Sequence, residues 1–169
     1  MSGTLVGIYL CAQAGEPMES RETATALAGR GLAGDRYAEA VGTFSSWPGK
    51  GRALTLIEAE ALESLERERG VALAPHESRR NLVVRDLRLE DLLGVRFRLG
   101  EVVLVGRRTA PPCEHLEQLT RPGVLKALVG RGGLRADIEV GGELRVGETL
   151  EILGPAPVGP DESSCAGES

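Results

Sequence analysis

The chain has 169 residues, of which 41% are hydrophobic, 27% charged and 3% aromatic, a composition that excludes a collagen, a coiled coil and a wholly disordered chain. Lys and Arg number 20 against 25 Asp and Glu, and the resulting net charge of −5 argues against a duplex-binding surface that depends on excess basic charge. A single domain of this length buries roughly 70% of its unfolded-state surface. With so few aromatic residues, its core is expected to consist of Leu, Val, Ile and Ala.

The compartment is predicted from what the sequence lacks. No apolar run approaches the roughly 20 residues that span a bilayer, and the first residues, MSGTLV, lack the basic region and cleavage site of a signal peptide. We therefore expect a cytoplasmic protein that binds neither a membrane nor nucleic acid. The three cysteines, Cys11, Cys113 and Cys165, form no CxxC pair and no zinc or iron–sulfur ligand pattern, so any thiol chemistry falls to one cysteine acting alone.

The first elements are a strand and a long irregular region. Residues Thr4–Cys11 (TLVGIYLC) form a short apolar run with β-branched and aromatic members, which predicts a buried strand. A turn is expected at residues 14–17. Residues 29–50 carry many glycines and polar side chains with little periodicity, which is typical of a functional or mobile loop.

The clearest helical pattern follows Leu54. Thr55 with Glu58 three residues later predicts a capping box at the start of a helix, Leu62 and Leu65 supply its apolar stripe, and Gly70 marks its end.

The second half of the chain reads mainly as short strands. Strands are predicted at Asn81–Arg85, Arg96–Leu99, Glu101–Val105, Leu134–Val140, Leu144–Val146 and Thr149–Leu153, with a hairpin turn at Gly100, a helical turn at Leu87–Leu93 and a second helix at Pro122–Gly130. Many short strands without regular β-α-β alternation favour a barrel or sandwich with helical insertions over a doubly wound sheet. We expect one domain over residues 1–154 and a disordered acidic tail over residues 155–169.

Cys113 is the candidate for thiol chemistry. It follows two prolines in the sequence TAPPCEHL, and proline fixes φ, so the loop that carries the thiol is expected to be stiff. Arg107, Arg108 and His115 could supply a cationic field that lowers the thiol pKa, and the thiolate is the form that acts as a nucleophile or soft-metal ligand. The alternative is a small, inert, buried side chain.

Basic clusters beside glycine or asparagine form a second set of candidates. They are Gly34–Arg36, Arg79–Asn81 and Arg131–Gly133. Glycine lets the backbone approach an anion, and a guanidinium offers phosphate a bidentate fork. The alternative is that these arginines are ordinary solvated surface residues.

Seven motifs in order resemble the MOSC domain, the family named after the C-terminal part of molybdenum cofactor sulfurases. The resemblance runs from about Leu5 to Leu153, and the motifs are Gly31–Arg36, Leu54–Glu58, Arg79–Val83, Leu92–Phe97, Pro111–Cys113, Arg131–Gly133 and Gly142–Gly147. It implies a mainly β fold, a closed or partly open β-barrel similar to the pyruvate kinase barrel, with a few short helices.

The resemblance also implies the roles of individual residues. Cys113 would be the catalytic cysteine and the ligand to molybdenum of a pterin cofactor, or would carry sulfur as a persulfide. A pocket that holds the phosphate of the cofactor would be lined by Asp35, Arg36, Arg80, Asn81, Arg131 and Gly132.

Domains that larger relatives possess are missing from this sequence. It contains no pyridoxal-phosphate desulfurase domain and no ferredoxin-like cysteine cluster, so neither pyridoxal phosphate nor an iron–sulfur cluster is expected. Electrons or sulfur would then come from a separate reductase or cysteine desulfurase.

Three functions remain open at this point. The first is a molybdenum-cofactor enzyme that reduces N-hydroxylated bases with a partner reductase. The second is a sulfur carrier that passes a Cys113 persulfide to metal–sulfur cofactor assembly. The third is a non-catalytic barrel that binds a phosphorylated small molecule.

Overall fold

The computed structural model of the chain describes residues 2–11, 18–28, 31–35, 54–70, 73–74, 78–110 and 132–156. Several predicted features lie outside these ranges. They are Arg36, Cys113, His115, Arg131, the helix at Pro122–Gly130 and residues 157–169 of the tail.

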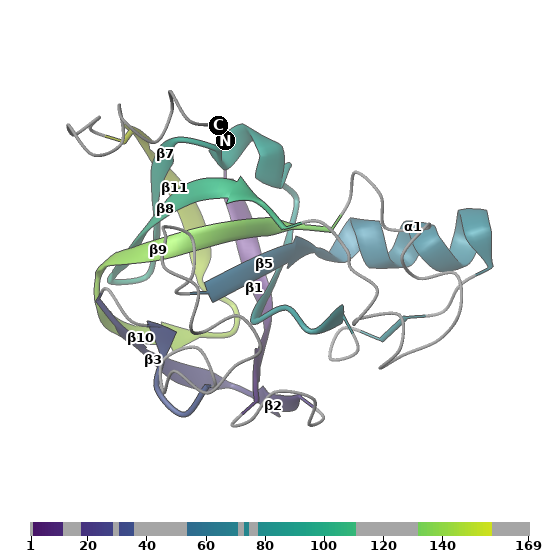
Figure 1. Ribbon diagram of the computed structural model, residues 1–169, viewed down its shortest axis with the longest axis horizontal. Coiled ribbons are helices and arrows are strands. Elements are labelled where there is room, and N and C mark those ends of the chain that lie inside the picture. Colours follow the sequence, from purple (N-terminus) through teal and green to yellow (C-terminus); the bar gives the residue numbers. More distant parts are fainter. Residues whose placement is uncertain are drawn as a thin grey trace.

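Seven strands form a closed β-barrel in the order β11-β7-β8-β9-β5-β6-β1, and β1 pairs with β11 to complete the ring. Their bounds are β1 Ser2–Leu10, β5 Leu54–Glu58, β6 Leu82–Arg85, β7 Val95–Leu99, β8 Val102–Thr109, β9 Leu134–Val140 and β11 Thr149–Pro155. In Figure 1, β8, β9 and β5 cross the front of the barrel while β1 passes behind them. The prediction of a mainly β barrel is confirmed.

A smaller sheet lies beside the barrel. It consists of β10 (Gly142–Arg145), β3 (Thr23–Leu27) and β4 (Gly31–Leu32), and a short strand β2 (Glu19–Arg21) extends the main sheet from β1. Strands β2, β3 and β4 were not predicted. In β3 the buried residues are alanines that alternate with threonines, and this pattern has too little contrast in hydrophobicity to predict a strand.

The barrel interior is filled by aliphatic side chains, as the composition predicts. Along β9, Leu134, Ala136 and Ile138 are buried while the residues between them are not, which is the period of two expected of a strand with one face toward a core. Among the described residues, Phe97 is the only aromatic side chain in this core.

One helix, α1 (Ala59–Arg69), connects β5 to β6, which are parallel neighbours, so the barrel contains a β-α-β unit. Leu62 and Leu65 of α1 pack on a second apolar cluster outside the barrel, and Gly70 ends the helix at φ 68, as predicted. The predicted capping box is wrong. Thr55 lies inside β5, and Glu58 occupies the N-cap position without a side-chain capping hydrogen bond, because the chain stays extended until the helix begins.

The remaining elements follow the sequence closely. β7 and β8 form the expected hairpin through Gly100, which has φ 60. The expected helical turn is a 3-10 helix at Leu89–Leu92, named η2. β9 and β11 lie where strands were predicted, whereas β10 begins two residues before the predicted Leu144–Val146 and ends at Arg145; β11 ends at Pro155.

Candidate functional site

Arg80 joins the two ends of the segment that carries Cys113. The Nε of Arg80 donates to the carbonyl oxygen of Gly132 at 2.8 Å, and its Nη2 donates to that of Ala110 at 2.9 Å. Ala110 also donates its N–H to the carbonyl oxygen of Gly133 at 2.8 Å. The arginine is only 8% exposed. The described residues on either side of positions 111–131 therefore meet at one point, where the buried guanidinium bonds to both of them.

Asn81, the residue before β6, connects β5 and β1 through hydrogen bonds. Its Oδ1 accepts the N–H of Thr55 at 3.1 Å, its own N–H donates to the Thr55 Oγ1 at 3.1 Å, and its Nδ2 donates to the Tyr9 carbonyl at 3.2 Å. Thr55 and Asn81 are both buried. Tyr9 packs on the outer apolar cluster, and desolvation raises the pKa of its phenol.

Asp35 and Arg79 meet at Cys11, directly after β1. The Oδ1 of Asp35 accepts the N–H of Cys11 at 2.9 Å, and the Nη2 of Arg79 lies 3.7 Å from the Cys11 Sγ. Asp35 is fully buried and Cys11 is 2% exposed. The prediction that Cys11 is a core residue is confirmed, but its contact with an arginine was not foreseen.

The structure thus brings four of the predicted cofactor-binding residues into one network. Arg80 contacts Gly132, Asn81 is its chain neighbour, and Asp35 is connected through Cys11 and Arg79. Each of the three side chains is hydrogen-bonded to backbone groups of the protein itself.

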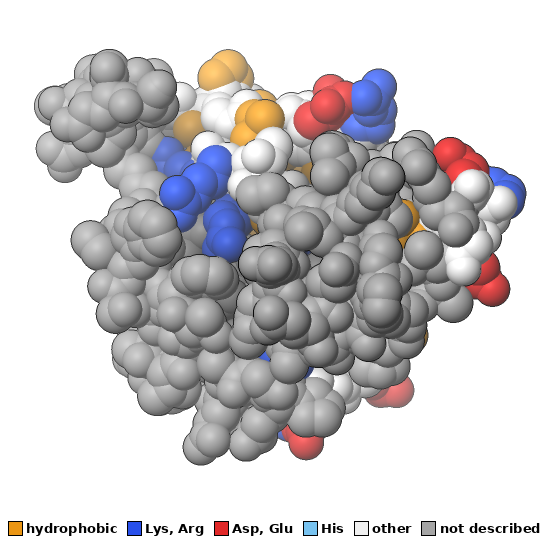
Figure 2. Space-filling view, turned by 45° about the vertical axis from the view of Figure 1, so that its right-hand side comes forward, with side chains coloured by type: hydrophobic (Ala, Val, Ile, Leu, Met, Phe, Trp, Pro, Cys, Tyr) orange, Lys and Arg blue, Asp and Glu red, His pale blue; other side chains and the backbone are white. Residues whose placement is uncertain are grey.

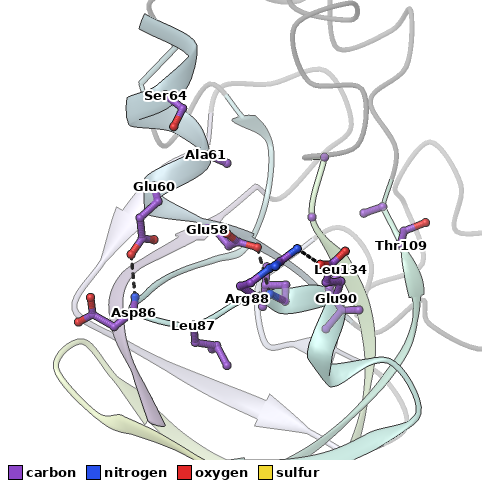
Figure 3. A pocket seen from close by; sticks show the side chains of 14 residues that line it. Glu58, Glu60, Ala61, Ser64, Asp86, Leu87, Arg88, Glu90, Thr109 and Leu134 are labelled. Atoms are coloured by element: carbon purple, nitrogen blue, oxygen red, sulfur yellow. Dashed lines mark hydrogen bonds and ion pairs between the residues drawn. The ribbon is translucent and has the colours of Figure 1, made fainter. Parts of the chain in front are cut away.

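A cavity of about 780 Å³ opens beside the Ala110–Gly132 junction. Its described wall comes from the start of α1, from the segment between β6 and η2, from the end of β8 and from the start of β9 (Figure 3). Ala110, Gly132 and Gly133 belong to this wall, so the junction that Arg80 closes is part of the rim of the cavity.

The described wall of the cavity is acidic. It carries the carboxylates of Glu58, Glu60, Asp86 and Glu90 against one base, Arg88, which is paired with Glu90. Figure 3 shows Glu60 next to Asp86 near the start of α1, and Arg88 next to Glu90. Among the residues that the structure describes, no group of three or more His, Cys, Asp or Glu side chains is arranged to hold a metal ion.

Two of these carboxylates are anchored by backbone amides. The Oε2 of Glu58 accepts the N–H of Leu89 at 3.0 Å, and the Oε2 of Glu60 accepts that of Asp86 at 2.8 Å. Within the described part of the chain, the buried Oε1 of Glu60 has no hydrogen-bond partner. This acidic wall was not predicted, because Glu58 was assigned to a capping box and the backbone partners of Glu58 and Glu60 lie 31 and 26 residues further along the chain.

The fold and the cavity define the class of protein, which is a small closed β-barrel with a cavity at its rim. A family model described as the MOSC domain matches residues 44–151, and the chain belongs to this family. The resemblance found in the sequence motifs is confirmed.

Solved structures agree on the fold. The YuaD protein from Bacillus subtilis superposes with a TM-score of 0.75 at 16% identity, covering 90% of this chain and 96% of that one. YiiM from Geobacillus stearothermophilus gives 0.68 at 16% identity, with 95% and 78% covered, and YiiM from Escherichia coli gives 0.65 at 19% identity, with 98% and 76% covered. A comparison with curated proteins finds no match. In the described residues, no helix has the length and apolar character needed to cross a membrane.

Proposed function

We propose that this MOSC protein uses Cys113 as a molybdenum ligand at the rim of the acidic cavity and reduces a basic, N-hydroxylated compound with electrons from a partner reductase. The observation that carries the proposal is the junction of Ala110 and Gly132, because it anchors the Cys113 segment at the cavity wall.

Chain geometry supports the position of the thiol. Ala110 lines the cavity, and Cys113 follows it by three residues. Three peptide units keep the two Cα atoms within about 11 Å of each other. This limit supports a Cys113 thiol close to the rim.

The charge of the cavity supports a basic substrate. Four carboxylates and one paired arginine on the described wall attract a cation and repel an anion. Backbone amides already hold the side chains of Glu58 and Glu60 in place. Binding a protonated nitrogen would therefore cost little side-chain entropy.

Cys113 suits the metal of the cofactor, but the described wall of the cavity does not suit its phosphate. A thiolate is a soft ligand that suits molybdenum. A phosphate against this wall would face carboxylates, and Asp35, Arg80 and Asn81 already bond to backbone groups. We therefore assign the phosphate to Arg36 and Arg131 and give Asp35, Arg80 and Asn81 positioning roles.

When bound, the cofactor would supply a two-electron redox centre. Conversion of an N–OH group to N–H and water takes two electrons and two protons, and the electrons come from the partner reductase. The carboxylates of Glu58 and Glu60 hold the basic nitrogen at the rim.

The decisive experiment measures molybdenum in protein purified from a host that makes the cofactor. We expect about one molybdenum per chain in the wild type and almost none in Cys113→Ser, because removal of a metal ligand costs most of the affinity. Cys165→Ser is the matched control and should bind as the wild type does. Equal, negligible metal in the wild type and Cys113→Ser would contradict the proposal.

The same protein can be tested for sulfur transfer. After incubation with a cysteine desulfurase and cysteine, a mass increase of about 32 Da on Cys113 corresponds to a persulfide. Such an adduct in protein that binds no molybdenum would replace the proposed function with that of a sulfur carrier.

A further inference from the structure

Two arginines face each other on the outside of the barrel. Arg108 of β8 is the register partner of Arg135 of β9. Arg108 is exposed and Arg135 is partly exposed, whereas the neighbouring Leu134 and Ala136 point into the core. The two guanidinium groups therefore lie on the same outer face, on adjacent strands.

A β-bulge brings a third arginine to this face, and an acidic side chain neutralises it. The register of β8 shifts between Gly106 and Arg108, so Arg107 is the extra residue. Arg107 also reaches the outer face, where its Nε donates to the Asp137 Oδ2 at 2.9 Å. A bulge redirects side chains and often marks a functional position.

Within the described part of the chain, other outer-face arginines have acidic partners, whereas Arg108 and Arg135 have none. Arg96 pairs with Glu139, Arg98 with Glu151 and Arg107 with Asp137. For Arg108 and Arg135, no described carboxylate lies within ion-pair distance. Among the side chains coloured in Figure 2, a group of basic ones lies apart from the acidic ones.

Like charges in register on adjacent strands destabilise a sheet. An anion bound between Arg108 and Arg135 would reverse this repulsion. A phosphate group suits the geometry, since it has several acceptor oxygens and each guanidinium offers a planar fork of donors.

We propose that Arg108 and Arg135 form a binding site for a phosphate-type oxyanion, either free phosphate or a phosphate ester, on the outer face of β8 and β9. The site is separate from the acidic cavity, whose described wall contains neither arginine. It does not depend on the proposed function, because it requires neither Cys113 nor a metal.

The test is an NMR titration of the arginine Nε–H signals with inorganic phosphate and, separately, with phenyl phosphate, at ionic strength matched with sodium chloride. We expect saturable shifts at Arg108 and Arg135. In Arg108→Gln or Arg135→Gln the affinity should fall by roughly fivefold or more, because one of two charged forks is lost. Tighter binding of phenyl phosphate than of phosphate would identify an ester as the ligand, and the reverse would identify the free anion.

The matched control is Arg98→Gln, which removes an outer-face arginine that Glu151 already neutralises. It should leave the phosphate titration unchanged. Because Arg108 and Arg135 repel each other, both single variants should fold. Their melting temperatures in phosphate-free buffer should equal or exceed that of the wild type. Shifts that chloride alone reproduces, or titrations that are equal in the wild type and both variants, would overturn the proposal.

Discussion

Arg80 places a charged guanidinium in a buried position, where it must be fully hydrogen-bonded to be tolerated. Two of its acceptors are the carbonyls of Ala110 and Gly132, which lie 30 and 52 residues further along the chain. The planar fork of arginine matches two acceptors that face it side by side. At the residue scale, this one side chain determines where the Cys113 segment begins and ends.

Arg80→Lys should therefore destabilise the protein although it keeps the charge. An ammonium group cannot reproduce the fork, so one buried carbonyl loses its charged donor, and the free energy of unfolding should fall by about 1.5–3 kcal/mol. Urea unfolding followed by circular dichroism measures this change. Arg98→Lys, at an exposed ion pair, is the control and should change stability by less than about 1 kcal/mol. If both variants unfold like the wild type, Arg80 is not what holds the junction.

At the scale of elements, β9 begins unusually close to β5. Gly133 has φ 116, and a Cβ at this position would lie 2.1 Å from the carbonyl oxygen of Leu56. The same residue accepts the N–H of Ala110. Only glycine allows β9 to start here and to close the rim of the cavity in the same place.

Gly133→Ala should separate β9 from β5 and loosen the rim. Gly147→Ala is a suitable control, because Gly147 also has a positive φ, 101, but nothing lies within 4 Å of its added Cβ. Both variants bear backbone strain, and Gly133→Ala bears a steric clash in addition. We expect the free energy of unfolding to fall by about 1–3 kcal/mol more in Gly133→Ala than in Gly147→Ala. Equal losses in the two variants would show that the approach to Leu56 is relaxed at little cost.

The elements that sequence reasoning predicted are those whose pattern is local. β9 alternates, Gly100 marks a hairpin, and Gly70 ends α1. The capping box failed because Thr55 bonds to Asn81 of a neighbouring strand, a contact 26 residues away that overrides the local signal.

The sequence motifs suggested candidate site residues but not the contacts that these residues make. The motifs identified Asp35, Arg80, Asn81 and Gly132, which the structure joins in one network. That Arg80 bonds to backbone carbonyls depends on barrel closure, which brings Ala110 and Gly132 together. The spacing of residues along the sequence does not show that Ala110 and Gly132 lie close together. The acidic wall of the cavity depends on the same closure of the barrel.

At the scale of the whole molecule, charge is divided between two regions that meet at the end of β8. Thr109 and Ala110 lie on the acidic cavity, while Arg108 lies with Arg135 on the outer face. The net charge of −5 conceals this separation. Since both regions include residues at the end of β8 and the start of β9, the rigidity of the barrel determines how each is presented to a ligand.

That rigidity depends on the seam between β1 and β11, which three residue pairs close, among them Gly3 with Leu150. A Cβ on Gly3 would lie 2.8 Å from the Arg85 carbonyl oxygen and 2.9 Å from Leu87 Cδ2. Gly3→Ala should displace β1 at its clash with β6 and so disturb the pairing of Gly3 with Leu150 that closes the seam, leaving β1 and β11 as open edges there.

Hydrogen exchange would reveal this opening. We expect amides of β1 and β11 at the seam to exchange about tenfold or more faster, corresponding to roughly 1.4 kcal/mol in the local opening free energy, while those of the β8–β9 ladder change less because their pairing is remote from the seam. Val6→Ala, an exposed change in the same strand, is the control and should leave the exchange pattern close to the wild type. A uniform acceleration across all strands in Gly3→Ala would mean instead that the barrel opens only as a whole, so that the seam has no independent stability.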